Sequence, residues 1–178
     1  MKDLQVITGC MFAGKTTALI SRLKSLNEHY LLVKPKVDIR DHEEQIVTHS
    51  GITERAISVH KLSDIFDKLS DIKVVGIDEA QFFQKSIISD LDYLHSNGIR
   101  VIVAGLEKDY LNQPFGSMVE IISIAESITR LMAICHRCGG DAIYSHRKNT
   151  DTKEQLLIGN KNFYEALCET CFQNNKII

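Results

Sequence analysis

The chain of 178 residues is 44% apolar and 25% charged and has a formal net charge of -2, as expected for a soluble protein with one main domain. This balance lacks the excess of positive charge that nucleic-acid binding requires, so no nucleic-acid partner is expected. The N-terminus enters an apolar strand without a signal-peptide pattern, and no run of about 18 apolar residues predicts a membrane helix. We therefore expect a cytoplasmic protein without a membrane partner.

Continuous apolar runs of strand length alternate with segments of helical periodicity. Strands are expected at residues 4–9, 30–35, 72–80 and 100–105, and helices at 16–27, 62–70 and 85–97. Continuous rather than alternating apolar runs indicate strands covered on both faces, which predicts an α/β fold with a parallel sheet flanked by helices. Residues 36–54 are polar, contain no obvious element and are expected to include a long mobile loop.

The first expected strand is followed by "TGCMFAGKTT", residues 8–17. Gly9, four residues and then Gly14-Lys15-Thr16 make the pattern of a phosphate-binding loop. Its backbone N–H groups are expected to surround phosphate oxygens, while Lys15 contacts the terminal phosphates and the Thr16 hydroxyl binds Mg²⁺. The alternative is a glycine turn with a solvated lysine, which the strand before and the helix after the loop disfavour. The intervening members of the loop are Cys10, Met11, Phe12 and Ala13.

A later strand ends in "DEAQ", residues 78–81. Asp78 stands where a phosphate-loop protein places a carboxylate that holds Mg²⁺. Glu79 follows at the expected carboxyl edge of the sheet, where it can accept a proton from an attacking oxygen. The alternatives are an ordinary strand-terminal aspartate and a surface glutamate.

Two cysteine pairs lie late in the chain, Cys135-x₂-Cys138 and Cys168-x₂-Cys171. Four thiolates at this spacing predict a closed, structural Zn²⁺ site, and four core-filling cysteines are the alternative. With the short strand-like pieces at 142–146 and 154–159, they indicate a small zinc-binding lobe. We expect an ATP-binding core with the phosphate loop at residues 1–127 and this lobe at residues 128–178.

Several motifs together resemble the type II thymidine kinases, the cytosolic zinc-containing family. They are "TGCMFAGKT", "KPKVDIR", "DEAQFF", "GLEKDYLNQPFG", "CHRCG", "EQLLIG" and "FYEALCETC", in the order of that family. The resemblance implies a phosphate-loop NTPase-type fold and transfer of the γ-phosphate of ATP to thymidine, with Mg²⁺ and structural Zn²⁺ as cofactors.

The resemblance also implies roles for individual residues. Asp38 and Arg40 match an Asp-x-Arg motif near the phosphates, with Arg40 offsetting charge during transfer. Asp78 matches the magnesium-associated aspartate, Glu79 matches the general base for the 5′-hydroxyl, and Ala80 and Gln81 complete the nucleotide-contacting segment. The residues similar to the nucleoside pocket are Met11, Phe82, Leu106, Tyr110, Phe115, Tyr164 and the covering loop Gln155, Leu156, Leu157, Ile158 and Gly159.

The family further implies inhibition by thymidine triphosphate (dTTP) and a homotetramer or dimer. Deoxyuridine is expected as a second substrate, because a pocket that reads the base edge by hydrogen bonds discriminates poorly on one methyl group. Three other classes are compatible with single motifs: a DExx-type helicase ATPase, a nucleoside monophosphate kinase with a zinc lid, and a zinc-ribbon module that uses nucleotide as a switch. Because the phosphate loop and the zinc site are expected in different lobes, a metal-free but folded protein is expected to retain ATP binding and to lose thymidine binding.

Overall fold

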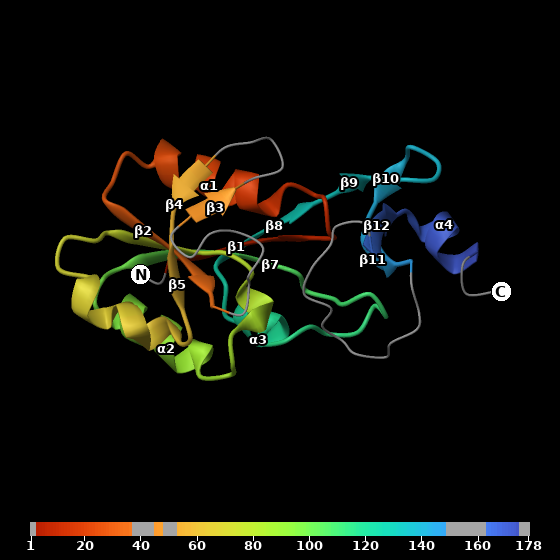
Figure 1. Cartoon of the computed structure of the whole chain (residues 1–178). Coiled ribbons are helices and arrows are strands. Elements are labelled where there is room, and N and C mark those ends of the chain that lie inside the picture. The colour runs from red at the N-terminus through yellow and green to blue at the C-terminus, as the bar shows by residue number, and fades with distance from the viewer. Residues whose placement is uncertain (1–2, 37–44, 48–52, 149–162, 175–178) are drawn as a thin grey trace.

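Six strands form one parallel sheet in the order β5-β2-β6-β7-β1-β8 (Figure 1). The computed structural model describes residues 3–36, 45–47, 53–148 and 163–174. The strands of this sheet are β1 (Leu4–Gly9), β2 (Tyr30–Pro35), β5 (Ile57–Val59), β6 (Val74–Ile77), β7 (Arg100–Gly105) and β8 (Ser127–Leu131). Near the β8 edge of the sheet, Val6 of β1 lies opposite Val103 of β7 on one side and Ile128 of β8 on the other.

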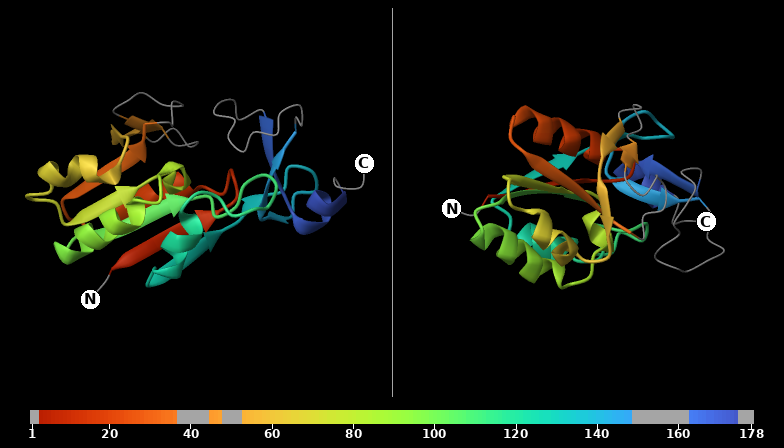
Figure 2. Two further views of the ribbon diagram at one scale, coloured as in Figure 1. Left: turned by 90° about the horizontal axis from the view of Figure 1, so that it is seen from below. Right: turned by 60° about the vertical axis from the view of Figure 1, so that its left-hand side comes forward.

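Helices cover both faces of the sheet, as Figures 1 and 2 show. Helix α1 (Lys15–Ser25) lies on one face with the short antiparallel hairpin of β3 (Gln45–Val47) and β4 (Thr53–Arg55). The other face carries α2 (Ile87–Ser96), α3 (Met118–Ser123) and the 3₁₀ helix η1 (Leu62–Lys68). Each face has its own apolar cluster, so the sheet is buried on both sides. A parallel sheet with this double cover confirms the α/β expectation.

Helix α1 packs closely on β6 because Gly76 has no side chain. A Cβ atom at Gly76 would lie 2.5 Å from Cδ1 of Leu23 and 3.2 Å from Cδ1 of Leu32. Both leucine side chains are buried. Glycine at this position therefore lets α1 settle directly over the middle strands of the sheet.

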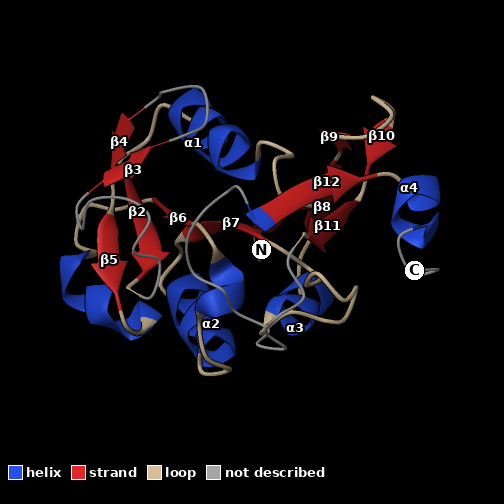
Figure 3. Ribbon diagram, turned by 45° about the vertical axis from the view of Figure 1, so that its right-hand side comes forward, coloured by secondary structure: helices blue, strands red, loops and turns tan. Residues whose placement is uncertain are grey.

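A smaller lobe lies beyond the carboxyl ends of β1 and β8 (Figure 3). It contains two antiparallel pairs, β9 (Ala133–Ile134) with β10 (Asp141–Ala142) and β11 (Tyr144–Arg147) with β12 (Tyr164–Leu167), and the short helix α4 (Glu169–Asn174). Tyr144 of β11 stacks on Phe172 of α4 with ring centroids 4.3 Å apart. The lobe therefore has a small core of its own.

The structure refines several expectations. The expected strands at 4–9, 30–35 and 100–105 are confirmed, whereas β6 is shorter than the expected 72–80 and residues 62–70 contain a 3₁₀ helix. The expectation of no element in 36–54 is wrong, because β3 and β4 fall within or beside it; three-residue strands are too short to give a periodic signal. Strand β8 places residues 128–131 in the main sheet, although the sequence assigned them to the C-terminal lobe. Residues 154–159 lie outside the described part of the chain.

None of the helices in the described ranges has the length and apolar character needed to cross a membrane.

Candidate active site

The loop between β1 and α1 has a backbone that requires glycine at two positions. Gly9 has φ 148°, and a Cβ atom there would lie 2.3 Å from the carbonyl oxygen of Leu131. Gly14 has φ 79° and immediately precedes the first residue of α1. Glycine adopts these conformations without the strain that a side chain would add. The loop therefore leads directly to a helix N-terminus, the arrangement that binds phosphate.

Lys15 and Thr16 begin α1 at the carboxyl edge of the sheet. The buried Lys15 ammonium donates to the carbonyl oxygen of Cys10 at 2.9 Å, inside the loop. The Thr16 hydroxyl donates to Oδ2 of Asp78 at 3.0 Å, across 62 residues of sequence. The donor set of a hydroxyl and a carboxylate oxygen fits Mg²⁺, which prefers oxygen ligands. The structure thus brings together the two residues that the sequence assigned to magnesium.

Glu79 and Gln81 extend this edge toward the next strand. Glu79 has φ 51°, a left-handed conformation that is uncommon for a residue with a side chain and that clusters at functional sites. Its carboxylate accepts a hydrogen bond from Nε2 of Gln81, and Oε1 of the buried Gln81 accepts from the backbone N–H of Leu106 at 2.9 Å. Gln81 therefore orients Glu79 and attaches it to the segment that follows β7.

Aromatic side chains gather near the same edge. The rings of Phe82 and Phe115 meet edge to face with centroids 5.6 Å apart. Tyr110, in the segment after β7, lies under the guanidinium of Arg147, which also contacts Tyr164. Residues expected to wall a nucleoside pocket are therefore contributed by the main sheet and by the C-terminal lobe.

The phosphate loop also contacts the C-terminal lobe. The backbone N–H of Met11 donates to Oγ of Ser145 at 3.0 Å, and the buried Cys10 thiol donates to the carbonyl oxygen of Ala142 at 3.3 Å. Burial raises the pKa of the Cys10 thiol, which keeps the donor proton in place. The ring of Phe12 lies 5.0 Å from that of His136. The loop and the lobe are therefore in direct contact, which leads us to expect that loss of the metal affects ATP binding as well; the sequence alone predicted that ATP binding is independent of the metal.

The four lobe cysteines converge on one point. Their sulfur atoms all lie within 4.8 Å of one another, and those of Cys138 and Cys168 are 3.6 Å apart. Tetrahedral zinc with bonds of about 2.3 Å would separate its sulfur ligands by about 3.8 Å, so the cluster fits Zn²⁺. Backbone N–H groups, first that of Cys168, lower the pKa of Cys135 to about 6, whereas the neighbouring thiols, first that of Cys168, raise the pKa of Cys171 to about 12. Metal binding by the four cysteines would therefore release protons from the cluster.

Two residues of this region escaped the sequence analysis, Ser145 and Arg147. Both are buried on one face of β11, while Tyr144 and His146 are on the other. In a strand, alternate side chains share a face, so the sequence does place Ser145 and Arg147 on one face of β11. It does not reveal that this face is the buried one, because both faces of this short strand carry polar residues. The sequence-assigned residues Asp38, Arg40 and 155–159 lie outside the described residues, so their roles stay predictions.

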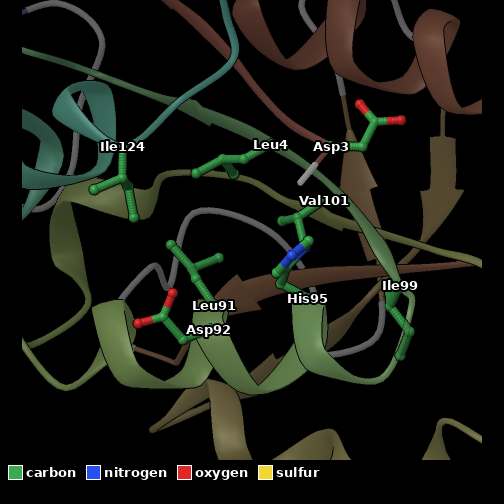
Figure 4. A pocket seen from close by; sticks show the side chains of 8 residues that line it. All are labelled: Asp3, Leu4, Leu91, Asp92, His95, Ile99, Val101 and Ile124. Atoms are coloured by element: carbon green, nitrogen blue, oxygen red, sulfur yellow. The ribbon is translucent and has the colours of Figure 1, made fainter. Parts of the chain in front are cut away.

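A small hollow lies at the opposite end of the sheet (Figure 4). It is lined by α2 and by the first residues of β1 and β7: Asp3, Leu4, Leu91, Asp92, His95, Ile99, Val101 and Ile124. Open parallel sheets bind their ligands at the carboxyl ends of the strands, whereas this hollow lies at the amino ends. It therefore has no part in the candidate active site.

Comparison with known proteins identifies a family whose members match this chain over most of its length. The family model described as thymidine kinase matches residues 2–172. The chain is 40% identical to a thymidine kinase of Bacteroides thetaiotaomicron over 172 residues, covering 95% of this chain and 86% of the relative. It is 39% identical over 174 residues to a thymidine kinase of Mesomycoplasma hyopneumoniae, with 94% of each chain covered.

Among solved structures, a RuvB Holliday junction branch migration motor of Thermotoga maritima matches with a TM-score of 0.43 and 16% identity. The match covers 72% of this chain and 37% of the motor, and a likeness this weak does not indicate an activity.

The contacts between the phosphate loop and the lobe predict that loss of zinc weakens both thymidine binding and ATP binding. In the Cys168→Ser variant we expect loss of zinc, a severe loss of thymidine binding, and ATP binding weakened by about tenfold. The last figure corresponds to weakening both hydrogen bonds between the loop and the lobe, those of Met11 and Cys10, which together contribute about 1.4 kcal/mol. Zinc content and calorimetric titration of each ligand, on protein whose sheet is shown to be folded by circular dichroism, measure these effects.

Ser145→Ala is the matched control, because it removes the bond to Met11 and keeps all four cysteines. It should retain zinc and show a smaller loss of ATP affinity. Unchanged ATP affinity in folded, zinc-free Cys168→Ser protein would show that the contacts between loop and lobe carry no coupling.

Proposed function

The chain belongs to the thymidine kinase family, and from this premise we propose that it transfers the γ-phosphate of ATP to the 5′-hydroxyl of thymidine, giving dTMP and ADP. The proposal rests on three hydrogen bonds. The Thr16 hydroxyl bonds to Asp78, and Gln81 bonds both to Glu79 and to the backbone of Leu106. Together they place the residues after the phosphate-binding loop, the expected base and the segment expected to hold the nucleoside along one edge of the sheet. We also propose a cytoplasmic role in nucleotide salvage and DNA precursor synthesis.

In the proposed mechanism each group has one task. The backbone of residues 9–16 and the Lys15 ammonium hold the phosphates of ATP, and Thr16 and Asp78 hold Mg²⁺. Bound Mg²⁺ neutralises charge on the donor phosphates. The Glu79 carboxylate accepts the proton of the 5′-hydroxyl as the new O–P bond forms. Arg40 is assigned to the charge that develops on the transferred group.

The nucleoside is proposed to lie between Met11, Phe82, Leu106, Tyr110 and Phe115, with 155–159 and Tyr164 over it. The contact between Phe82 and Phe115 supports this, because the backbone N–H of Phe82 donates to the carbonyl oxygen of Glu79 at 3.1 Å and so places one aromatic wall beside the proposed base. Deoxyuridine is proposed as a second substrate, because one methyl group changes binding by only about 1–3 kcal/mol.

The deciding experiment offers γ-labelled ATP to the purified protein with thymidine, thymidylate or single-stranded DNA in separate reactions. Labelled dTMP from thymidine supports the proposal. Label transferred to thymidylate would instead indicate a monophosphate kinase, and phosphate release stimulated by DNA would indicate a helicase-type ATPase. Nucleotide binding without any turnover would indicate a non-enzymatic switch.

Glu79→Gln tests the general base. The amide keeps the shape and can still contact Gln81, but it cannot accept the proton, so kcat should fall by about 10²–10⁴ while ATP affinity stays near that of the wild type. Single-turnover transfer of label and calorimetry measure the two quantities. Glu120→Gln, the same change on the exposed α3, serves as the control, and turnover near the wild-type value in Glu79→Gln would refute the assignment.

Inhibition by dTTP is proposed to occur at the active site, with its base in the thymidine pocket and its phosphates toward the phosphate loop. One base-binding loop then serves both ligands, so inhibition should be competitive with thymidine. Initial rates over a matrix of both concentrations measure this. A noncompetitive pattern that persists in Tyr110→Leu protein would indicate a separate regulatory site.

A homotetramer is proposed on the resemblance, and the edge strand β8 supports self-association. Among the described residues β8 pairs on one side only, with β1, and Ile128, Met132 and Ile134 are exposed along it and just beyond. Exposed apolar strand edges favour pairing with another chain. Light scattering should find an oligomer that Ile128→Lys shifts toward smaller species, whereas Val119→Lys on α3 should not; a wild-type monomer would contradict the proposal.

A further inference from the structure

Arg147 is the last residue of β11 and its side chain is almost fully buried, with 1% of its surface exposed. In the pairing of β11 with β12 it stands directly opposite Tyr164. Directly opposed residues of an antiparallel pair share a face of the sheet. Ser145, two residues earlier on that face, receives the hydrogen bond from Met11 of the phosphate loop. Arg147 therefore sits on the side of the lobe that faces the candidate active site.

The Arg147 guanidinium joins two aromatic residues from different parts of the chain. Its central carbon lies 3.7 Å from the ring centroid of Tyr110 and 5.5 Å from that of Tyr164. Its Nη2 and Nε atoms also donate to the Tyr164 hydroxyl at 3.0 and 3.3 Å. Tyr110 follows β7 of the main sheet, whereas Tyr164 begins β12 of the lobe. One buried cation thus fixes the position of both rings.

The chemistry of this contact is specific to arginine. A planar guanidinium can stack on a ring and donate in its own plane at the same time, whereas an ammonium on a flexible stem cannot do both with the same geometry. Cation–π attraction is stronger when the cation is desolvated, as it is at this buried position. A lysine in place of Arg147 would keep the charge but lose the stacking on Tyr110 and the in-plane hydrogen bonds to Tyr164.

We propose that Arg147 is a positioning residue for the nucleoside, because its guanidinium contacts both the Tyr110 ring and the Tyr164 ring and so fixes where each lies beside a bound base. The inference rests on the proposed function, which assigns both rings to the nucleoside pocket. Arg147 acts through the two tyrosines and not on the reacting atoms. Its loss should therefore weaken thymidine binding in the ground state and the transition state alike, which raises KM and leaves kcat nearly unchanged.

The test compares Arg147→Lys and Arg147→Gln with the wild type. In both variants we expect KM for thymidine to rise by about 10- to 100-fold, the loss that a desolvated cation–π contact and a charge-assisted hydrogen bond together represent. KM for ATP, kcat and zinc content should stay within about twofold. Lys148→Gln removes a cation from the next, exposed position and should leave all four quantities unchanged.

A double-mutant cycle with Tyr110→Leu separates positioning from general support of the lobe. If Arg147 acts through Tyr110, Arg147→Gln should raise KM for thymidine much less in the Tyr110→Leu background than in the wild type. Tyr164→Phe, which keeps the ring and removes the hydroxyl, should give a smaller rise in KM than Arg147→Gln.

Three outcomes overturn the inference while leaving the proposed function intact: KM for thymidine within twofold of the wild type, equal loss of both substrates together with zinc, or additive effects in the cycle. Failure of the proposed function looks different, because the wild-type protein itself would then form no dTMP. In that case the assignment of the two rings to a nucleoside pocket falls, and the inference falls with it.

Discussion

The hydrogen bond between Thr16 and Asp78 depends on how closely α1 can approach β6. Thr16 belongs to the helix that follows β1, but Asp78 follows β6, and β7 lies between these two strands in the sheet. The helix must therefore pass over β7 and settle on β6. Gly76 permits this, because a side chain there would collide with Leu23 of α1. One glycine two residues before Asp78 thus connects the packing of the core to the chemistry of the site.

The sequence predicted those elements whose pattern reflects burial. β1, β2 and β7 are continuous apolar runs because helices cover both of their faces, and α1 buries Leu19, Ile20 and Leu23 at helical spacing. β8 escaped because it is a largely exposed edge strand whose polar residues give no apolar run. The β3–β4 hairpin escaped because each strand has three residues, and the helical spacing at 62–70 did not distinguish an α-helix from a 3₁₀ helix.

The site was predictable where local spacing decides the chemistry. Two glycines and a lysine at fixed offsets specify a phosphate loop, and two Cys-x₂-Cys pairs specify a metal cluster. Contacts across the fold were not predictable from spacing. Ser145 stands 134 positions from Met11, and a lone arginine such as Arg147 is most often a solvated surface cation. Its burial follows from a strand pairing that the residue types alone do not encode.

Metal binding by the four cysteines is much stronger than the hydrogen bonds that link the lobe to the phosphate loop. A structural zinc site binds with roughly 10–16 kcal/mol at neutral pH, whereas a net hydrogen bond such as Met11 to Ser145 contributes about 0.5–1.5 kcal/mol. A bound metal would therefore hold β10, β11 and β12 in place, because these strands lie between the two cysteine pairs. The weaker contacts at Cys10 and Met11 would then transmit this arrangement to the loop. Strand β11 contacts the phosphate loop through Ser145 and contacts Tyr110 and Tyr164 through Arg147. A displacement of that strand would therefore move the loop and these two rings together, so the main sheet alone does not position either of them.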